Sequence, residues 1–524
     1  SLNFSGSALL LASAQRRWAT TAATDVRPLK PKLERGPSMK SPLLDMPTPL
    51  AHVSQLKTPS TRITTLRNGV RVATEETYGQ ATAMGVFVDA GSRNETFETN
   101  GTTHVLQRMG FKATTNRTSA EIVQKLESLG VNAISSSSRE AMVYTAEVVR
   151  GDVEEVVEVL ADSVTNPLLL EEDLQEQKIA VGRELEDMVH DPPSWLPEIL
   201  HELAYGPEGL GLSHLCPPSN LEHIGREQLH NFVKTYYVGP RVVVAAAGVE
   251  HDSFVKLCAK HFDSLPAAEG GKPLHVPSVY KGGAHVEFMS PENEKRLQEL
   301  QAESDKPPPS HVALVFEGSG LNDPDLYATC VLQSLLGGGS SFSSGGPGKG
   351  MYTRLYRRVL NNYGFVDSAS CFNSFYLDSG LFGIYSTVQH KDIGNMLHIM
   401  SVELVDLTGF SAPIGQEEFD RAKNQLRSGI FMNLEQRAVL CDDIGRQVLS
   451  YGERKSAQEL SDLIEKVTIE DVMRVARRIL STKPTLVVYT PEKYATLVPS
   501  HERLCAWFDA INDKLNGKES SESK

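Results

Sequence analysis

The chain has 524 residues, of which 40% are hydrophobic and 23% are charged, and its formal net charge is −14. A single hydrophobic core rarely grows beyond about 250–300 residues, so this length predicts at least two domains. The acidic balance argues against nucleic acid as the main partner, because phosphate binding needs a basic surface. No apolar run in the sequence reaches the roughly 18–20 residues that span a bilayer.

The first 36 residues differ in composition from the rest of the chain. Lysine and arginine outnumber aspartate and glutamate there by six to two, and serine, threonine and alanine are abundant. This composition is typical of a mitochondrial transit peptide, and Arg17-Trp18-Ala19-Thr20 resembles a presequence cleavage site. We therefore expect residues 1–36 to be a targeting segment that is disordered or cleaved. A tail of chance composition is the alternative.

Strand and helix patterns follow a proline-rich stretch at residues 28–60. Asn68-Gly69 between two alternating runs predicts a β-hairpin, and residues 81–91 indicate a further strand. Residues 151–164 place four valines and a leucine on one helical face, with glutamates on the other. The continuous apolar run at 241–249 predicts a buried strand.

The two halves of the chain resemble each other. The tripeptide Val-Leu-Gln at 105–107 returns at 331–333, and the segment from 171 to 206 parallels the segment from 417 to 452. Matches in the same order predict an α/β fold of the α+β type, built from two homologous halves that an internal repeat relates. Coincidence is the alternative. The expected divisions are a first half at 60–268, a linker at 269–283, a second half at 284–510 and a disordered tail at 511–524.

The six cysteines are scattered, with no C-x-x-C pair and no Cys/His ligand spacing. So few cysteines in so long a chain argue against a disulfide scaffold and favour a reducing compartment. They are Cys216, Cys258, Cys330, Cys371, Cys441 and Cys505.

A predicted helix carries His104, Gln107 and Arg108 in the run HVLQRMGFKAT. This run is similar to the H-x-x-E-H-x-x-F-K-G-T pattern of the pitrilysin-type metallopeptidases. In that family two histidines bind zinc, the glutamate activates water, and a later carboxylate completes the site. Glu184 lies 80 residues after His104, at the place of that carboxylate, whereas Gln177 stands where the family has another acid.

The chemistry of the family does not survive in this run. Gln107 cannot take a proton from water, and Arg108 has no lone pair for zinc. The resemblance therefore implies a pitrilysin-like fold with a degenerate site, no catalysis and no cofactor in this chain. Residual metal binding by His104 and Glu184 is the alternative.

The segment GGGSSFSSGGPGKG occupies residues 337–350, and seven of its fourteen residues are glycine. A phosphate-binding P-loop needs G-x-x-x-x-G-K-[ST], but Ser343 and Gly350 replace its first glycine and its last residue. A plain linker is disfavoured because the segment lies inside one half. A functional loop that adapts to a ligand is the remaining interpretation.

This segment and the following MYTRLYRRVLN resemble the α subunits of mitochondrial processing peptidases, a branch of the same family. There an inactive α subunit binds arginine-rich presequences, and a zinc-bearing β subunit cleaves them. The resemblance implies the same partners here, in the mitochondrial matrix or on the matrix face of the inner membrane. It also implies substrate contact by Gly337, Gly338, Gly339, Ser340, Phe342, Gly345, Gly346, Gly348, Lys349, Gly350, Glu418, Asp442 and Asp443.

Two other functions remain open at this stage. Relatives in the same family are core subunits of respiratory complex III, where the partners would be cytochrome b and cytochrome c1, and one chain could serve both roles. An autonomous metallopeptidase is the other alternative.

Overall fold

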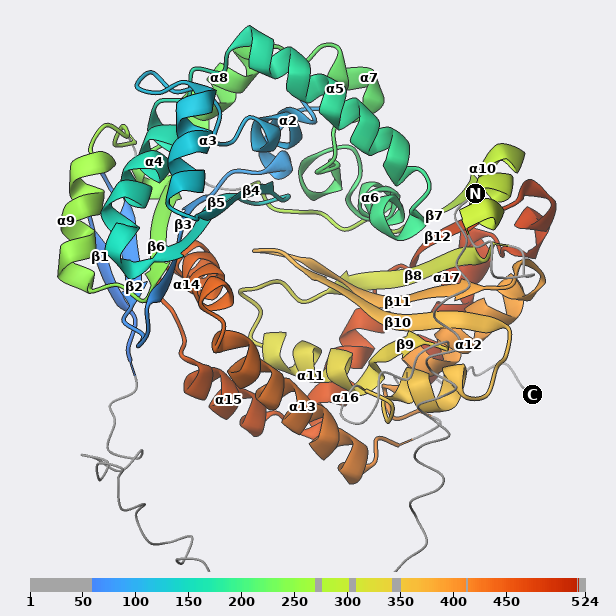
Figure 1. The fold of residues 1–524 in the computed structure, drawn as a ribbon. Coiled ribbons are helices and arrows are strands. Elements are labelled where there is room, and N and C mark those ends of the chain that lie inside the picture. The colour runs from blue at the N-terminus through green and yellow to red at the C-terminus, as the bar shows by residue number, and fades with distance from the viewer. Residues whose placement is uncertain are drawn as a thin grey trace, which may run out of the picture. The chain divides into compact units, whose positions relative to one another are not determined.

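Two six-stranded β-sheets organise the chain from Pro59 onward (Figure 1). The computed structural model describes residues 59–268, 276–300, 308–341, 350–410, 413–515 and 517. The first sheet contains β1 (Arg62–Thr65), β2 (Arg71–Glu75), β3 (Ala81–Val88), β4 (Asn132–Ser137), β5 (Met142–Val149) and β6 (Val242–Ala247). The second contains β7 (Gly283–Phe288), β8 (Ser310–Gly318), β9 (Gly338–Ser340), β10 (Val366–Phe375), β11 (Gly380–Val388) and β12 (Thr485–Thr490).

The strand order confirms the internal repeat. The first sheet runs β1-β2-β6-β3-β5-β4, and the second runs β7-β12-β8-β11-β10-β9. In each sheet one pair is parallel, β2 with β6 and β7 with β12, and the remaining pairs are antiparallel. Five strands therefore correspond in order and direction. The additional strands β1 and β9 lie at opposite edges of this shared pattern.

The predicted hairpin at Asn68-Gly69 joins β1 to β2. Gly69 has φ +93°, a left-handed conformation that glycine adopts without steric cost. The amide of Leu66 donates to the carbonyl of Val70 at 2.7 Å, which closes the turn. The predicted buried strand is β6, whose six residues are all buried.

Helices cover the two sheets. The predicted helix at 151–164 is α4, and its apolar face is buried as expected. In the first half the helices are α2 (Thr102–Arg108), α3 (Ser119–Ser128), α4 (Val153–Thr165), α5 (Glu171–Met188), α6 (Pro192–Tyr205), α7 (Pro218–Leu221), α8 (Arg226–Tyr236) and α9 (His251–His261). In the second they are α10 (Pro291–Leu300), α11 (Leu326–Leu336), α12 (Ile393–Asp406), α13 (Gln416–Leu434), α14 (Arg437–Tyr451), α15 (Ala457–Lys466), α16 (Ile469–Leu480) and α17 (His501–Leu515).

The C-terminal boundary corrects one prediction. Helix α17 continues to Leu515, so the expectation of a disordered tail from residue 511 is wrong for residues 511–515. Phe508 in this helix is 2% exposed and packs edge-on against Phe316 of β8. This apolar contact holds the helix against the second sheet, and the polar composition of the last residues concealed it.

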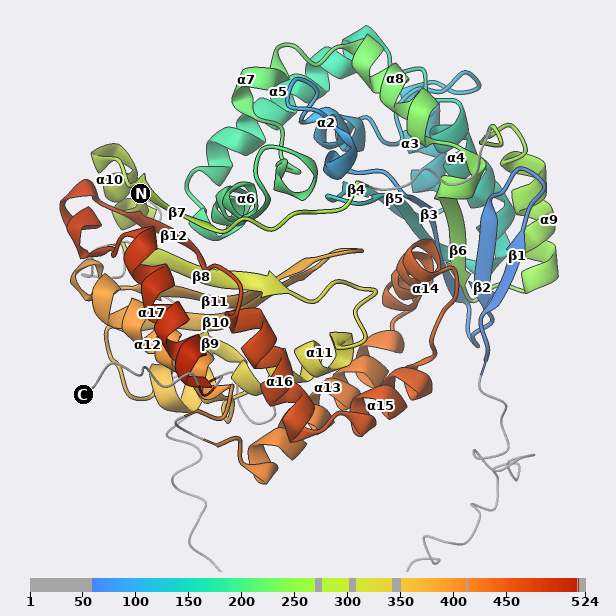
Figure 2. The same cartoon turned by 180° about the vertical axis from the view of Figure 1, so that it is seen from behind.

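Each half contributes one helix to the sheet of the other half (Figures 1 and 2). Helix α6 of the first half packs on β12, β7 and β8, and α14 of the second half packs on β3, β6 and β2. Leu440, Ile444 and Val448 of α14 are buried among the alanines and valines of the first sheet. Burial of each such side chain contributes about 1.5–3 kcal/mol. The exchange therefore joins the two halves through both hydrophobic cores.

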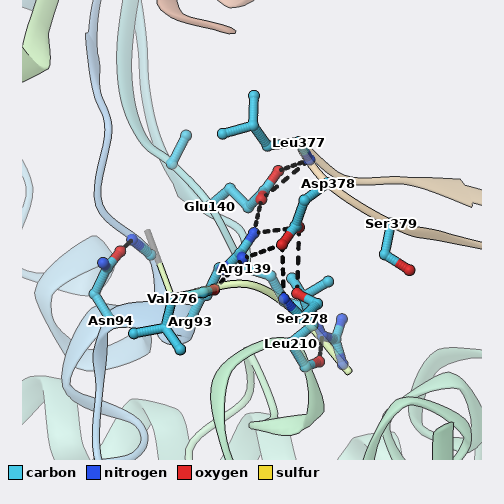
Figure 3. A network of polar contacts seen from close by, with 12 residues as sticks. Arg93, Asn94, Arg139, Glu140, Leu210, Val276, Ser278, Leu377, Asp378 and Ser379 are labelled. Carbon is cyan, nitrogen blue, oxygen red and sulfur yellow. Dashed lines mark hydrogen bonds and ion pairs between the residues drawn. The ribbon is translucent and has the colours of Figure 1, made fainter. Parts of the chain in front are cut away.

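A buried arginine adds a polar connection between the halves (Figure 3). Arg93 follows β3, and its side chain is 3% exposed. Its guanidinium donates to Glu140 at 2.6 Å and to Asp378 at 2.8 and 2.9 Å. Asp378 lies in the β10–β11 turn and also accepts from the amide of Ser278 at 2.7 Å. One arginine thereby connects the first half, the chain just before β7, and the second half.

Two further features bear on the composition-based expectations. All six cysteines are free thiols, in agreement with their scattered positions. Of the helices in the described residues, none has both the length and the apolar composition that crossing a bilayer requires.

Candidate functional site

The predicted helix with His104 is α2, and it places His104 against Glu184 of α5. The ring of His104 is buried, and the backbone amide of Cys216 donates to Nδ1 at 3.0 Å. Because Nδ1 accepts this bond, Nε2 carries the ring hydrogen, and it lies 3.4 Å from Oε2 of Glu184. Burial lowers the pKa of His104, although Glu184 acts in the opposite direction, so the ring is neutral near pH 7.

Arg108 provides the positive charge at this place. It lies one helical turn after His104, and its guanidinium donates to the same oxygen of Glu184 that His104 faces. A guanidinium remains protonated near pH 7 and has no lone pair for a metal. The carboxylate of Glu184 is therefore neutralised by a side chain of the protein itself.

Gln107 has a structural contact instead of a catalytic one. Its Oε1 accepts from the backbone amide of Ser137 at 2.9 Å and from the hydroxyl of Ser137 at 2.7 Å. Ser137 ends β4, the edge strand of the first sheet. The side chain at the position of the family's general base therefore accepts a hydrogen bond from a backbone amide at the edge of the sheet.

A metal site cannot be assembled from the remaining groups. Gln177 is half-buried on α5 and offers an amide instead of a carboxylate. Of the residues at the positions of the family's metal site, His104 and Glu184 therefore remain as the two possible zinc ligands. Catalytic zinc sites use three protein ligands and a water. Within the described residues, no group of three or more His, Cys, Asp or Glu side chains could hold a metal ion.

The glycine-rich segment begins and ends in well-defined backbone. Gly337 ends α11 with φ +58°, and its carbonyl accepts from the amide of Cys371 at 2.8 Å. Gly338–Ser340 then form β9, the edge strand beside β10, so these three residues belong to a sheet and not to a loop. The predicted contacts Phe342, Gly345, Gly346, Gly348 and Lys349 lie outside the described residues.

Both ends of the segment line one cavity of about 410 Å³ between α11 and α13. Gly337, Gly338 and Gly350 contribute backbone to its wall, and Gln333 and Asn433 contribute amide side chains. A second cavity of about 380 Å³ shares Gly350 and extends along α13. The glycine segment therefore starts and finishes beside concave surface that a ligand could enter.

The three predicted acidic residues lie on two different helices. Glu418, in the first turn of α13, lines the second cavity and accepts from Arg354 at 2.6 Å. Burial raises the pKa of Glu418, but the bonds from Arg354 and from the amide of Gly415 outweigh it and hold the pKa below its usual range. The carboxyl of Glu418 is therefore ionised and paired.

Asp442 and Asp443 lie on α14, which packs against the first sheet. Asp442 is 41% exposed and pairs with Arg446 one turn later at 2.8 Å. Asp443 accepts from the buried Arg454 at 2.9 Å, and Arg454 also pairs with Glu75 of β2. Asp442 is the most exposed of the three carboxylates, whereas Asp443 belongs to a connection between the halves.

Comparison with known proteins assigns the family. Residues 71–218 match the family model described as insulinase (peptidase family M16), and residues 223–426 match the model described as peptidase M16 inactive domain. The chain belongs to peptidase family M16.

Several relatives of this chain are named mitochondrial-processing peptidase subunit alpha. The protein of that name from Neurospora crassa is 36% identical over 477 residues, which cover 80% of this chain and 82% of the relative. The protein from Solanum tuberosum is 37% identical over 435 residues, 82% of each chain. The protein from Rattus norvegicus is 34% identical over 484 residues, 91% of this chain and 90% of the relative.

The M16 chain also contains a cavity between its halves that the sequence did not predict. Its volume is about 470 Å³, and its wall includes the β4–β5 turn, the β10–β11 turn and the end of α14. His214 lines it and lies 2.9 Å from Glu198. Burial alone would raise the pKa of Glu198, but Arg139 and His214 outweigh burial and lower the pKa strongly. No local motif indicates this cavity, because its wall combines residues from both halves that are far apart in the sequence.

Two neighbouring residues were missed for a similar reason. Thr353 contacts both ends of the glycine segment, and Arg354 pairs with Glu418. Neither residue belongs to a motif with known chemistry. The arginines that follow the glycines were the available signal in the sequence. In the structure Arg354 is 3% exposed, and so buried an arginine requires an acidic partner.

Proposed function

We propose that this chain is the non-catalytic, substrate-recognising subunit of a mitochondrial processing peptidase. It pairs with a zinc-bearing β subunit, and hydrolysis takes place in that partner. The observation that carries the proposal is the Arg108–Glu184 ion pair, which puts a protein cation where an M16 peptidase needs its metal. The shared name of the relatives supports the same assignment.

Presequences are the proposed substrates, and the glycine-rich segment is the proposed contact. Substrates of different sequence need an adaptable surface, and glycine permits close approach of the peptide backbone. Asp442 is the carboxylate best placed to exchange its present partner, Arg446, for an arginine of the substrate, because both side chains are about half exposed. Glu418 and Asp443 would meet substrate by exchanging with Arg354 and Arg454.

The place of action follows from the partner. The chain works inside mitochondria, and we place it in the matrix or at the matrix face of the inner membrane. The names of the relatives favour the processing peptidase over a core subunit of respiratory complex III.

Cleavage by the separated and the combined subunits tests the proposal. The purified chain should not cleave a fluorogenic presequence peptide with or without added zinc, and the reconstituted pair with its β subunit should cleave it. A chelator should abolish the activity of the pair. Cleavage by the purified chain alone would contradict the proposal, and so would full activity of the β subunit without this chain.

A further inference from the structure

We propose that Thr353 is a positioning residue that fixes the two ends of the glycine-rich segment relative to each other. The inference rests on the proposed function of that segment in presequence binding. It concerns residues 337–341 and 350–354, which contain the two ends of the segment and are described by the structure.

The hydroxyl of Thr353 contacts both ends at once. Its Oγ1 accepts from the backbone amide of Gly338 at 3.2 Å. The same hydroxyl donates to the carbonyl of Gly350 at 2.8 Å. The backbone amide of Thr353 also donates to the carbonyl of Gly350, at 3.0 Å. One side chain thus uses its donor and an acceptor position to join Gly338 to Gly350, twelve positions apart in the sequence.

The close packing around Thr353 leaves no room for a Cβ at position 337 or 338. A Cβ added at Gly337 would lie 2.3 Å from Cγ2 of Thr353, far inside contact distance. A Cβ added at Gly338 would lie 2.1 Å from the carbonyl oxygen of Ala369 in β10. The two glycines therefore let the backbone lie against Thr353 on one side and the sheet on the other, and Thr353 itself is 8% exposed.

The next residue anchors Thr353 to the body of the second half. Arg354 is 3% exposed and donates to Glu418 at 2.6 Å, at the start of α13. At the other end, just after β9, the backbone amide of Ser341 donates to the backbone carbonyl of Asp367 at 2.8 Å. Both ends of the segment are therefore held by elements of the second half, and Thr353 joins one end to the other.

This arrangement has a consequence for binding. Gly337, Gly338 and Gly350 form part of the wall of the cavity of about 410 Å³, and the bonds of Thr353 hold Gly338 and Gly350 in one arrangement. A wall that is already in place has less conformational freedom to lose on binding, so part of the entropy cost is removed in advance. Loss of the Thr353 hydroxyl should therefore weaken presequence binding, because Gly338 and Gly350 are no longer held in one arrangement.

The matched variants are Thr353→Val and Thr353→Ser. Valine keeps the shape and removes both hydroxyl bonds, whereas serine keeps the hydroxyl. Each variant is reconstituted with the β subunit, and deuterium exchange is followed in the peptide that covers residues 337–341. We expect about three- to tenfold faster exchange in Thr353→Val, which corresponds to the loss of one or two net hydrogen bonds, and near-wild-type exchange in Thr353→Ser.

Kinetics on an arginine-rich presequence peptide supply the functional measurement. In Thr353→Val the KM should rise about three- to tenfold, with kcat within twofold of wild type, because the catalytic groups are in the partner. Thr353→Ser should restore the KM. Equal KM values in Thr353→Val and wild type would overturn the inference, and so would equal impairment in Thr353→Ser.

A deletion separates failure of this inference from failure of the proposed function. Removal of residues 342–349, which leaves β9 (Gly338–Ser340) and Ser341 in place, should raise the KM more than Thr353→Val does. If the deletion raises the KM and Thr353→Val does not, the positioning role is wrong and the proposed function stands. If neither raises it, the glycine segment does not bind presequences, and both fail.

Discussion

Arg108 of α2 donates to Glu184 of α5, on the same carboxylate oxygen that His104 faces at 3.4 Å. This contact explains why the site can be stable without a metal. A half-buried carboxylate beside a neutral imidazole would otherwise need a cation. The arginine supplies that cation permanently, so the helix pair is held together while the metal chemistry is lost.

The first prediction follows from this geometry. Arg108→His would place an imidazole one turn after His104, on the helix face that meets Glu184, and would complete two histidines and a carboxylate. We expect the variant to bind one zinc ion per chain, measured by equilibrium dialysis and metal analysis. The wild-type chain should retain none at the same zinc concentration.

A double variant serves as the control. Arg108→His with Glu184→Gln lacks the carboxylate and should bind zinc much more weakly than Arg108→His alone. Equal zinc binding in the two variants would mean that Glu184 does not reach the metal, contrary to its contacts with His104 and Arg108.

The second prediction distinguishes Glu418, which we expect to stabilise the fold, from Asp442, which we expect to be accessible to substrate. Glu418→Gln leaves the buried Arg354 without a charged partner, so we expect a loss of about 1–3 kcal/mol in the free energy of unfolding. Asp442→Asn removes an exposed pair with Arg446 and should change stability by less than about 0.5 kcal/mol.

Substrate competition completes this comparison. Asp442→Asn should weaken binding of a presequence with distal arginines more than binding of one in which these are replaced by glutamine. Urea unfolding and peptide competition in the reconstituted pair measure the two effects. If Asp442→Asn weakens both peptides equally, the carboxylate does not recognise arginine.

Local patterns accounted for much of the fold. Asn68-Gly69 predicted the hairpin because glycine tolerates the φ of +93° that the turn requires. The Val-Leu-Gln repeat predicted two related halves, and it lies on α2 and α11, which follow corresponding strands. The exchange of α6 and α14 could not be predicted, since an apolar helix face does not indicate which of two similar sheets it will cover.

For the candidate site, too, the sequence predicted some contacts and not others. His104 and Glu184 were expected to meet, because a family pattern fixed their separation, and they do meet. The partner of Glu418 was not expected, since Arg354 lies 64 positions earlier and no spacing rule connects the two. The roles of Gly337 and Gly338 also depend on tertiary contacts with Thr353 and β10, which composition alone cannot show.

The third prediction tests the helix exchange. A Cβ added at Gly445 of α14 would lie 2.2 Å from Cε2 of the buried Phe87 in β3. Gly445→Ala should therefore lower the free energy of unfolding, because overpacking costs about 1–3 kcal/mol and exceeds the gain in helix propensity. Thermal and urea unfolding measure the change.

Gly429 of α13 provides the matched control. Among the described residues, and apart from its chain neighbours and the backbone of α13 itself, no heavy atom lies within 4 Å of a Cβ added there. Gly429→Ala should leave stability unchanged or raise it by up to about 1 kcal/mol. If both variants behave alike, α14 does not lie as closely on the first sheet as the contact with Phe87 indicates.

The fourth prediction concerns pH. His201 of α6 donates from Nδ1 to the carbonyl of Pro197 at 2.6 Å and accepts from the hydroxyl of Tyr376 at 2.7 Å, which joins the two halves. Burial, then the charge of Arg139, lower the pKa of His201 to about 3. The ring stays neutral in the folded chain, whereas in the unfolded chain it binds a proton below about pH 6.5.

The direction in which stability changes with pH follows from the number of protons bound in the folded and unfolded states. Between pH 6.5 and 3 the unfolded chain binds the extra proton, so stability is complete above pH 6.5 and falls as the pH decreases. At pH 5 His201 should account for a loss of about 2 kcal/mol relative to pH 7.5. Urea unfolding at the two pH values measures the difference. His201→Asn should show a smaller difference by that amount, and an unchanged difference would mean that His201 is not the group that titrates.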